Sequence, residues 1–190
     1  MHSVSEIQLL LKERLSKKRY IHSLNVADES RKLAQKWNLD PEKAYFAGLI
    51  HDICKDCPQI EQNQMVKKSK MNISDVEYQI PSLWHAIAGA WYAENFLDIK
   101  DTDILSAVRY HTCGRAGMSQ LEEIVYIADL ISADRTYKDA ERMRKLAYSD
   151  LNKTMLEALK YSITDVVNKG SKLPHQTIEA YNQYTSVKDK

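Results

Sequence analysis

The sequence is poor in glycine, proline and cysteine. Only five glycines and four prolines occur in 190 residues, which is few for an all-β or loop-rich fold whose turns need them. Three cysteines cannot all pair, and that suits a reducing compartment. No apolar run approaches the roughly 20 residues that span a bilayer, and the first residues lack the basic start and apolar core of a signal peptide. We therefore expect a cytoplasmic protein with no membrane partner.

An excess of charge of one sign is also lacking. The chain has 27 basic and 26 acidic residues, for a net charge of +1. Such a balance gives no general attraction to nucleic acid, and only the short basic run Lys17-Lys18-Arg19 favours that partner. Nucleic-acid binding is therefore not expected. Hydrophobic residues at 44% and charged residues at 28% are typical of a globular domain.

What the chain does contain is a series of apolar residues at helical spacing, separated by helix-start signals. Ser3, Ser74 and Ser119 are each followed three residues later by glutamate, the capping-box pattern. Asp40-Pro41 and Asp101-Thr102 are further helix starts. No convincing alternating strand pattern occurs. We predict an all-α bundle forming one domain over residues 1–190, with a core of about 19–135 on which helices within 137–185 pack.

Several polar side chains do not fit an ordinary apolar core. Four histidines lie on, or at the end of, apolar helical stretches, and two carboxylates share these surroundings: His22, His51, His85, His111, Asp52 and Asp129. An unpaired charge is expensive to bury, so a shared cation is the simplest way to place these groups together. The neighbours His51 and Asp52 point about 100° apart within a helix. They can converge on one ion only where the helix ends or distorts.

A mixture of imidazoles and carboxylates suits iron, manganese, cobalt, nickel or zinc better than calcium. Cations near these groups indicate an anionic substrate: Arg19, Lys55, Arg115 and Arg135. The chain has neither a P-loop nor a G-x-G-x-x-G motif, so phosphate chemistry would depend on the metal and side chains. Cys54 and Cys57 form a C-x-x-C motif without a second pair or a thioredoxin-like setting, and their role is left open.

Five motifs carry a family resemblance. They are Arg19-Tyr20-x-His22, His51-Asp52-x-x-Lys55, His85-Ala86-x-x-Gly89, Tyr110-His111-Thr112, and Tyr126-x-Ala128-Asp129 with Arg135 beyond it. Their order resembles the HD-domain metal-dependent phosphohydrolase superfamily. Together they look like the YqeK-type symmetrical bis(5'-nucleosyl)-tetraphosphatases, which cleave diadenosine tetraphosphate to two ADP. The resemblance covers roughly residues 19 to 182 and implies a helical bundle of the HD-domain type.

The resemblance also implies roles for individual residues. A metal ion, iron in the first place, would be bound by His22, His51, Asp52 and Asp129, and a second ion near His85 and His111 is left open. The catalytic side chains would be Asp52, His85, His111 and Arg135. The dinucleoside polyphosphate or nucleotide substrate would be contacted by Arg19, Asp52, Lys55, His85, His111, Thr112, Asp129, Arg135, Gly170, Lys172, Pro174 and Thr177.

Three positions depart from the family pattern, all on the nucleotide side. Cys113 stands where a second threonine is expected, Ser132-Ala133-Asp134 replaces a Glu-Pro-Asn-like stretch, and Tyr181 stands where the family tends to have arginine. Other interpretations stay open. The chain could be another HD-domain nucleotidase or phosphodiesterase, a nucleotide-binding regulator without turnover, or a helical interaction module with ordinary core histidines. A homodimer is also left open.

Overall fold

The computed structural model describes residues 3–186, and within this range it contains eleven α-helices, one 3-10 turn and no β-strand. The helices are α1 Val4–Arg14, α2 Lys17–Lys36, α3 Pro41–Ile50, α4 Gln59–Lys68, α5 Asp75–Tyr78, α6 Trp84–Phe96, α7 Thr102–Tyr110, α8 Gln120–Ile131, α9 Ala140–Ala147, α10 Leu151–Asn168 and α11 His175–Ser186, with the 3-10 turn at Pro81–Leu83. The prediction of an all-α fold is confirmed. The prediction of a single domain is confirmed as well, whereas its bounds of 1–190, with a core of about 19–135, remain a prediction.

The helix starts form as their local sequence dictates. Ser3, Ser74 and Ser119 each accept a hydrogen bond from the backbone N–H of the glutamate three residues later, and that glutamate bonds back to the serine N–H. Asp40 accepts from two backbone N–H groups at the start of α3, where Pro41 follows it. These bonds satisfy donors that a helix leaves free at its first turn.

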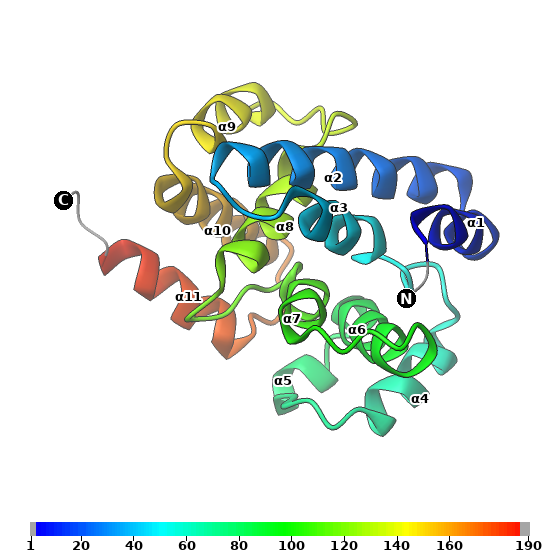
Figure 1. Ribbon diagram of the computed structural model, residues 1–190. Helices are drawn as coiled ribbons and strands as arrows, with labels where there is room; N and C mark the ends of the chain where they lie inside the picture. Colours follow the sequence, from blue (N-terminus) through cyan, green and yellow to red (C-terminus); the bar gives the residue numbers. More distant parts are fainter. Residues whose placement is uncertain (1–2, 187–190) are drawn as a thin grey trace.

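The centre of the fold is a layer formed by α2, α3, α6, α7 and α8. Helix α2 packs along α3 and against α8, while α7 bridges α3, α6 and α8. In Figure 1, α2 and α3 run side by side above α6 and α7, and α4 and α5 lie below. Helices α9 and α10 pack against α8, and α11 packs against α10. Consequently, residues far apart in the sequence meet between α2, α3, α7 and α8.

Close approach of α2 and α3 depends on a glycine. A Cβ atom at Gly48 would lie 2.6 Å from the Ser30 Oγ and 3.1 Å from the Ala27 Cα. The two helices therefore approach more closely than a side chain at this position allows without a shift of its neighbours. This contact sets the position of the C-terminal end of α3, where His51 follows.

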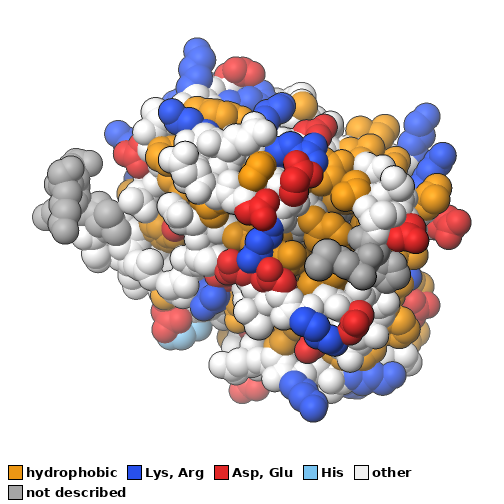
Figure 2. All heavy atoms as spheres, in the orientation of Figure 1, with side chains coloured by type: hydrophobic (Ala, Val, Ile, Leu, Met, Phe, Trp, Pro, Cys, Tyr) orange, Lys and Arg blue, Asp and Glu red, His pale blue; other side chains and the backbone are white. Residues whose placement is uncertain are grey.

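A separate hollow of about 960 Å³ lies between α1, α3 and the α6–α7 connection. Figure 2 shows hydrophobic side chains gathered on this face with charged groups at its rim. Its apolar lining consists of Val4, Phe46, Leu97, Ile99 and Ile104, and none of the predicted site residues contributes to it. The hollow is therefore distinct from the histidine-rich centre. Among the described residues, no helix has both the length and the apolarity to cross a membrane.

Candidate metal centre

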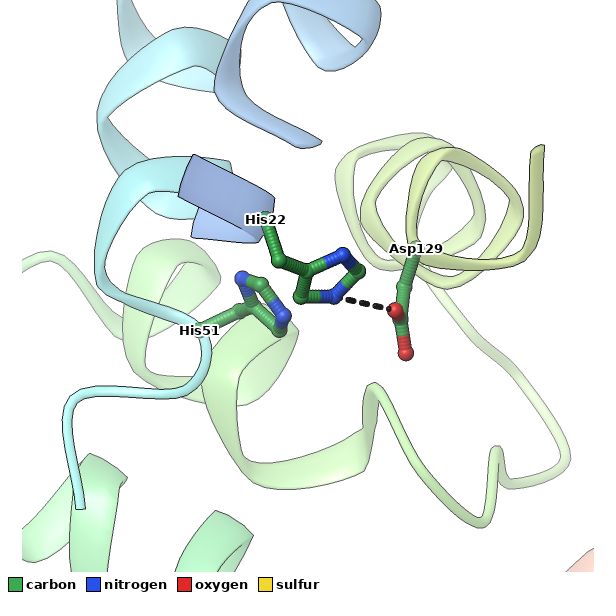
Figure 3. A group of neighbouring side chains, drawn as sticks. All are labelled: His22, His51 and Asp129. Atoms are coloured by element: carbon green, nitrogen blue, oxygen red, sulfur yellow. Dashed lines mark hydrogen bonds and ion pairs between the residues drawn. The ribbon is translucent and has the colours of Figure 1, made fainter. Parts of the chain in front are cut away.

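The first ligand cluster joins three helices. His22 comes from α2, His51 lies at the C-terminal end of α3, and Asp129 comes from α8. Figure 3 shows the three side chains pointing toward one another, with the His22 Nε2 2.9 Å from the Asp129 Oδ1. One ligand atom from each lies within 4.8 Å of the others. This spacing suits a single ion bound by two imidazoles and a carboxylate.

The second cluster shares His51 with the first and adds Asp52 and His111. The Asp52 Oδ2 lies 3.4 Å from the His51 Nε2, and its Oδ1 lies 3.4 Å from the His111 Nε2 and 3.3 Å from the His85 Nε2. The chain leaves the α-helix after Ile50, so these neighbours are not held in mid-helix register. His51 and Asp52 therefore converge at a helix end, as the sequence required.

Three of the imidazoles are held by main-chain carbonyl groups. The Nδ1 atoms of His51, His85 and His111 lie 2.6, 2.8 and 2.7 Å from the carbonyl oxygens of the residues three positions earlier. A carbonyl oxygen only accepts, so each Nδ1 carries the proton and donates it. Each Nε2 atom is then left on the side of the centre, where it can act as a ligand, which is how metal-binding histidines are usually fixed.

His22 is oriented by a carboxylate instead. Its Nδ1 lies 2.8 Å from the Asp134 Oδ2, and the other oxygen of Asp134 accepts a hydrogen bond from Asn25 at 3.0 Å. A carboxylate behind a ligating imidazole fixes the ring and increases its basicity. In the sequence, Asp134 stands out only as part of a departure from the family pattern. No local signal could have shown this role, because Asp134 lies 112 residues from His22.

The unsatisfied atoms of the centre fit a cation. The His51 Nε2 and the Asp52 Oδ1 are buried and have no hydrogen-bond partner among the residues that the structure describes. The Nε2 atoms of His51, His85 and His111 lie 3.3–3.4 Å from the Asp52 carboxylate oxygens, and a cation bound among them would satisfy nitrogen and oxygen atoms together. The donors are nitrogen and oxygen atoms, which suit a divalent transition metal. The residues present therefore fit a metal ion.

The surroundings keep both carboxyl groups ionised. Burial alone would raise the pKa of Asp52, but the imidazoles of His51, His111 and His85 hold it well below its usual range. Burial likewise opposes ionisation of Asp129, whose pKa is held well below the ordinary value by His22, His51 and Arg135. Burial also lowers the pKa of His85 to about 4, which makes this imidazole neutral at pH 7. All three side chains are thus in the protonation state that a metal site needs.

Cations surround the two clusters. Arg19 donates from Nη1 to the Asp52 Oδ2 at 2.7 Å, and Arg135 donates from Nη2 to the Asp129 Oδ1 at 2.5 Å. The Lys55 Nζ lies 3.1 Å from the His85 Nε2, and the Thr112 hydroxyl lies 3.3 Å from the same atom. These four side chains form one polar rim around the histidines. Arg115 is instead engaged by both carboxylate oxygens of Glu122, at 2.8 and 2.9 Å.

Comparison with known proteins identifies the family of the chain. The model of the HD domain matches residues 19–134, which is more than half of the chain and spans both ligand clusters. The chain belongs to the HD-domain family. HD-domain membership implies a divalent metal ion, and the two clusters are where the described part of the chain could hold one.

Named relatives cover nearly the whole HD-domain chain. A Bacillus subtilis protein named "Bis(5'-nucleosyl)-tetraphosphatase, symmetrical" is 35% identical over 93% of this chain and 94% of its own length. A Staphylococcus aureus protein of the same name is 33% identical over 96% of this chain and 94% of its own length. A crystal structure of a protein described as a "predicted HD superfamily hydrolase involved in NAD metabolism", from Clostridium acetobutylicum, is 40% identical. It superposes with a TM-score of 0.94 over 99% of this chain and all of that one.

The residues assigned to the nucleotide side lie on the connection between α10 and α11 and at the start of α11. Gly170 has a φ of 63° and closes α10, and Lys172 bonds to the side chain of Gln79 near α5. Pro174 and Thr177 are buried. Thr177 donates from Oγ1 to the Cys113 carbonyl oxygen at 2.8 Å. Thr177 is thereby linked to the loop that carries His111 and Thr112. Among the described residues, no direct contact joins Gly170, Lys172 or Pro174 to the histidines.

Proposed function

We propose that the protein hydrolyses dinucleoside tetraphosphates, cleaving diadenosine tetraphosphate symmetrically into two ADP. One observation carries the proposal: an HD-domain chain that matches proteins named symmetrical tetraphosphatases over nearly its full length. The rim of Arg19, Lys55, Thr112 and Arg135 around two ligand clusters supports it. Such a rim suits a polyphosphate, whose charge needs several donors at once.

The metal ion would be held by His22, His51, Asp52 and Asp129. We propose iron as the ion, with manganese, cobalt, nickel or zinc as alternatives that the same donors accept. A second ion near His85 and His111 belongs to the same proposal, supported by the cluster of His51, Asp52 and His111. When bound, a divalent ion supplies Lewis-acid polarisation of a phosphate oxygen and lowers the pKa of water at the site.

The side chains of the centre would have separate roles in the reaction. Asp52, ionised and buried, orients the attacking water through its carboxylate oxygens. His85 and His111 border the reacting phosphate, and Arg135 offers its guanidinium to the charge that develops there. Arg135 is also fixed through Nε, which donates to the Asp129 carbonyl oxygen at 2.8 Å. Its position is therefore set before substrate arrives.

Substrate binding would use the rim and the α10–α11 connection. Arg19 and Lys55 approach from α2 and from the turn after α3, and Thr112 comes from the loop after α7. Gly170, Lys172, Pro174 and Thr177 would border the nucleotide. The bond from Thr177 to the Cys113 carbonyl supports this assignment, because it couples α11 to the loop of His111.

The decisive experiment is product analysis. Metal-loaded protein is incubated with diadenosine tetraphosphate, and the products are separated by anion-exchange chromatography. The proposal expects ADP as the main product. AMP together with ATP, or a preference for mononucleotides or cyclic dinucleotides, would instead favour another HD-domain phosphohydrolase. Tight binding without any product would favour a nucleotide-binding regulator.

Variants separate the roles of metal ligand and rim. Asp52→Ala should lose activity by about 100-fold or more, the scale for removing a group that acts directly on the reacting centre. Metal content is measured in the same samples, and an Asp52→Ala protein that keeps both metal and activity contradicts the mechanism. Lys55→Gln should raise KM more than it lowers kcat. Lys67→Gln, at an exposed position on α4, is the matched control.

The cellular location and the oligomeric state complete the proposal. We place the enzyme in the cytoplasm, which cell fractionation tests. A homodimer would use the aromatic surface at the end of α6, where Trp91 packs on Phe96 with ring centroids 5.6 Å apart and Phe96 is 61% exposed. Light scattering of the purified protein measures its mass, and a Phe96→Ser variant should shift a dimer toward the monomer.

A further inference from the structure

The turn that follows His51 and Asp52 brings two cysteines together. The backbone N–H of Cys57 donates to the Cys54 carbonyl oxygen at 3.3 Å, closing a turn of four residues. Such a turn holds its first and last Cα atoms within about 7 Å, which overlaps the range of about 4.4–6.8 Å found in disulfides. No large backbone movement is therefore needed to join them.

Only one of the two thiols is placed to react with a small molecule. Cys54 is fully buried, whereas Cys57 is half-buried. The Arg14 Nη2 lies 3.1 Å from the Cys57 Sγ, and the guanidinium is itself stacked 4.2 Å from the centre of the Tyr92 ring. A fixed cation beside a sulfur atom stabilises the thiolate, the form that attacks disulfides.

The third cysteine lacks this setting. Cys113 is buried, and burial raises the pKa of its thiol to about 11. At Cys57, the neighbouring Cys54 thiol and the charge of Arg14 outweigh burial and lower the pKa to about 7. The geometry and the charge therefore single out Cys57 as the nucleophilic thiol of the described chain.

We propose that Cys54 and Cys57 form an oxidation site that a low-molecular-weight disulfide converts into an intrachain disulfide. The Cys57 thiolate attacks one sulfur of the small disulfide, a mixed disulfide forms, and one thiolate leaves. The Cys54 thiol then loses its proton to that thiolate and attacks the Cys57 sulfur, expelling the second thiolate. Two protein thiols are oxidised, and one small disulfide is reduced to two thiols.

The disulfide would change the centre because its ring encloses Lys55 and Asp56. Lys55 reaches His85, and the Asp56 Oδ2 accepts a hydrogen bond from the Ser16 N–H at 2.7 Å, at the start of α2. Helix α2 carries Arg19 and His22. Oxidation should therefore lower turnover by about tenfold, the scale of losing one charge-assisted contact to substrate. This consequence, unlike the disulfide itself, rests on the proposed function.

Alkylation tests the reactive thiol without any activity assay. Reduced, metal-loaded protein is treated with iodoacetamide over a range of pH, and the modified cysteines are identified by peptide mass spectrometry. Cys57 should be labelled first, with a midpoint at about pH 7. Arg14→Gln should slow its labelling at neutral pH. Arg31→Gln is the matched control, because Arg31 also stacks on a tyrosine, Tyr45 at 3.8 Å, and touches no thiol. Faster labelling of Cys113 overturns the assignment.

Oxidation with glutathione disulfide tests the pairing and its effect. The wild-type protein should lose two hydrogens in the peptide that contains both thiols, lose activity about tenfold, and recover with dithiothreitol. Cys57→Ser should show neither change. If Cys54→Ser does not fold, the Cys57→Ser and Arg14→Gln proteins still decide the matter. A stable glutathione adduct without the disulfide overturns the pairing, and a disulfide without loss of activity overturns its consequence. A chain that hydrolyses no tetraphosphate contradicts the proposed function alone.

Discussion

Asp134 provides a sensitive test of how the ligand histidines are held. Its Oδ2 accepts from the His22 Nδ1 at 2.8 Å, and its Oδ1 accepts from the Asn25 Nδ2 at 3.0 Å. Asp134→Asn removes the negative charge behind His22. It also supplies one acceptor where two are needed, because an asparagine that turns its oxygen toward His22 turns its amide toward the amide of Asn25. The substitution therefore affects both the basicity and the orientation of the His22 ring.

The magnitude follows from this position behind a ligand. Outer carboxylates of ligating histidines typically contribute about 10- to 100-fold in metal affinity, which corresponds to about 1.4–2.7 kcal/mol. His22 is 4% exposed, so water cannot readily replace Asp134 at the Nδ1 atom. Asp134 is one-third exposed at its side chain, which places the effect toward the lower half of that range.

The assay is competition for cobalt or zinc between the protein and a chromogenic chelator. Asp28→Asn, at an exposed position on α2, the helix that carries His22, is the control and should bind metal like the wild type. Asn25→Asp added to Asp134→Asn gives the new amide a carboxylate acceptor, which lets the amide oxygen stay turned toward His22, and should recover part of the affinity. The reasoning is refuted if Asp134→Asn binds metal as tightly as the wild type, or if Asp28→Asn weakens binding equally.

Three further predictions concern stability. Arg109→Met leaves the Glu77 carboxylate buried without the guanidinium that lies 2.6 Å away; the side chains of Arg109 and Glu77 are 4% and 2% exposed. The substitution should lower the free energy of unfolding in urea by about 3–5 kcal/mol. A Glu77→Leu, Arg109→Met double variant should recover much of this loss. Gly48→Ala places a methyl group 2.6 Å from the Ser30 Oγ and should cost about 1–3 kcal/mol in thermal unfolding. Burial raises the pKa of Glu123, so the folded state holds this proton more tightly, and stability from this group is lost as pH rises above the ordinary carboxyl range. Glu123→Gln should therefore stabilise the protein at neutral pH, by an amount that vanishes in acid; a pH-independent difference would contradict this.

Helix starts could be predicted because their signals are local. The capping boxes at Ser3, Ser74 and Ser119 need only a serine and a glutamate three residues apart, and all three form. The convergence of His51 and Asp52 could also be argued, because two adjacent side chains meet only where a helix ends. The structure shows that end after Ile50.

Contacts between distant segments could not be predicted in this way. Arg14 reaches Cys57 across 43 residues, and Asp134 reaches His22 across 112. Neither contact leaves a periodic or spaced pattern in the sequence, because each depends on how α1 and the segment after α8 pack on their neighbours. The C-x-x-C motif alone therefore indicates no role for its cysteines, which depends on the turn between Cys54 and Cys57 and on the contact with Arg14. The assignments of metal ligands and substrate contacts stay predictions for the experiments above.

The two ligand clusters connect parts of the chain that lie far apart in the sequence. The bond from His22 to Asp129 spans 107 residues, and His51 and His111 come from two further helices. An ion that binds this arrangement, and not the unfolded chain, acts as a cross-link whose strength depends on concentration. At 100 times its dissociation constant it would add about 2.7 kcal/mol to the free energy of unfolding. The melting temperature of this fold is therefore a measure of the free metal around it.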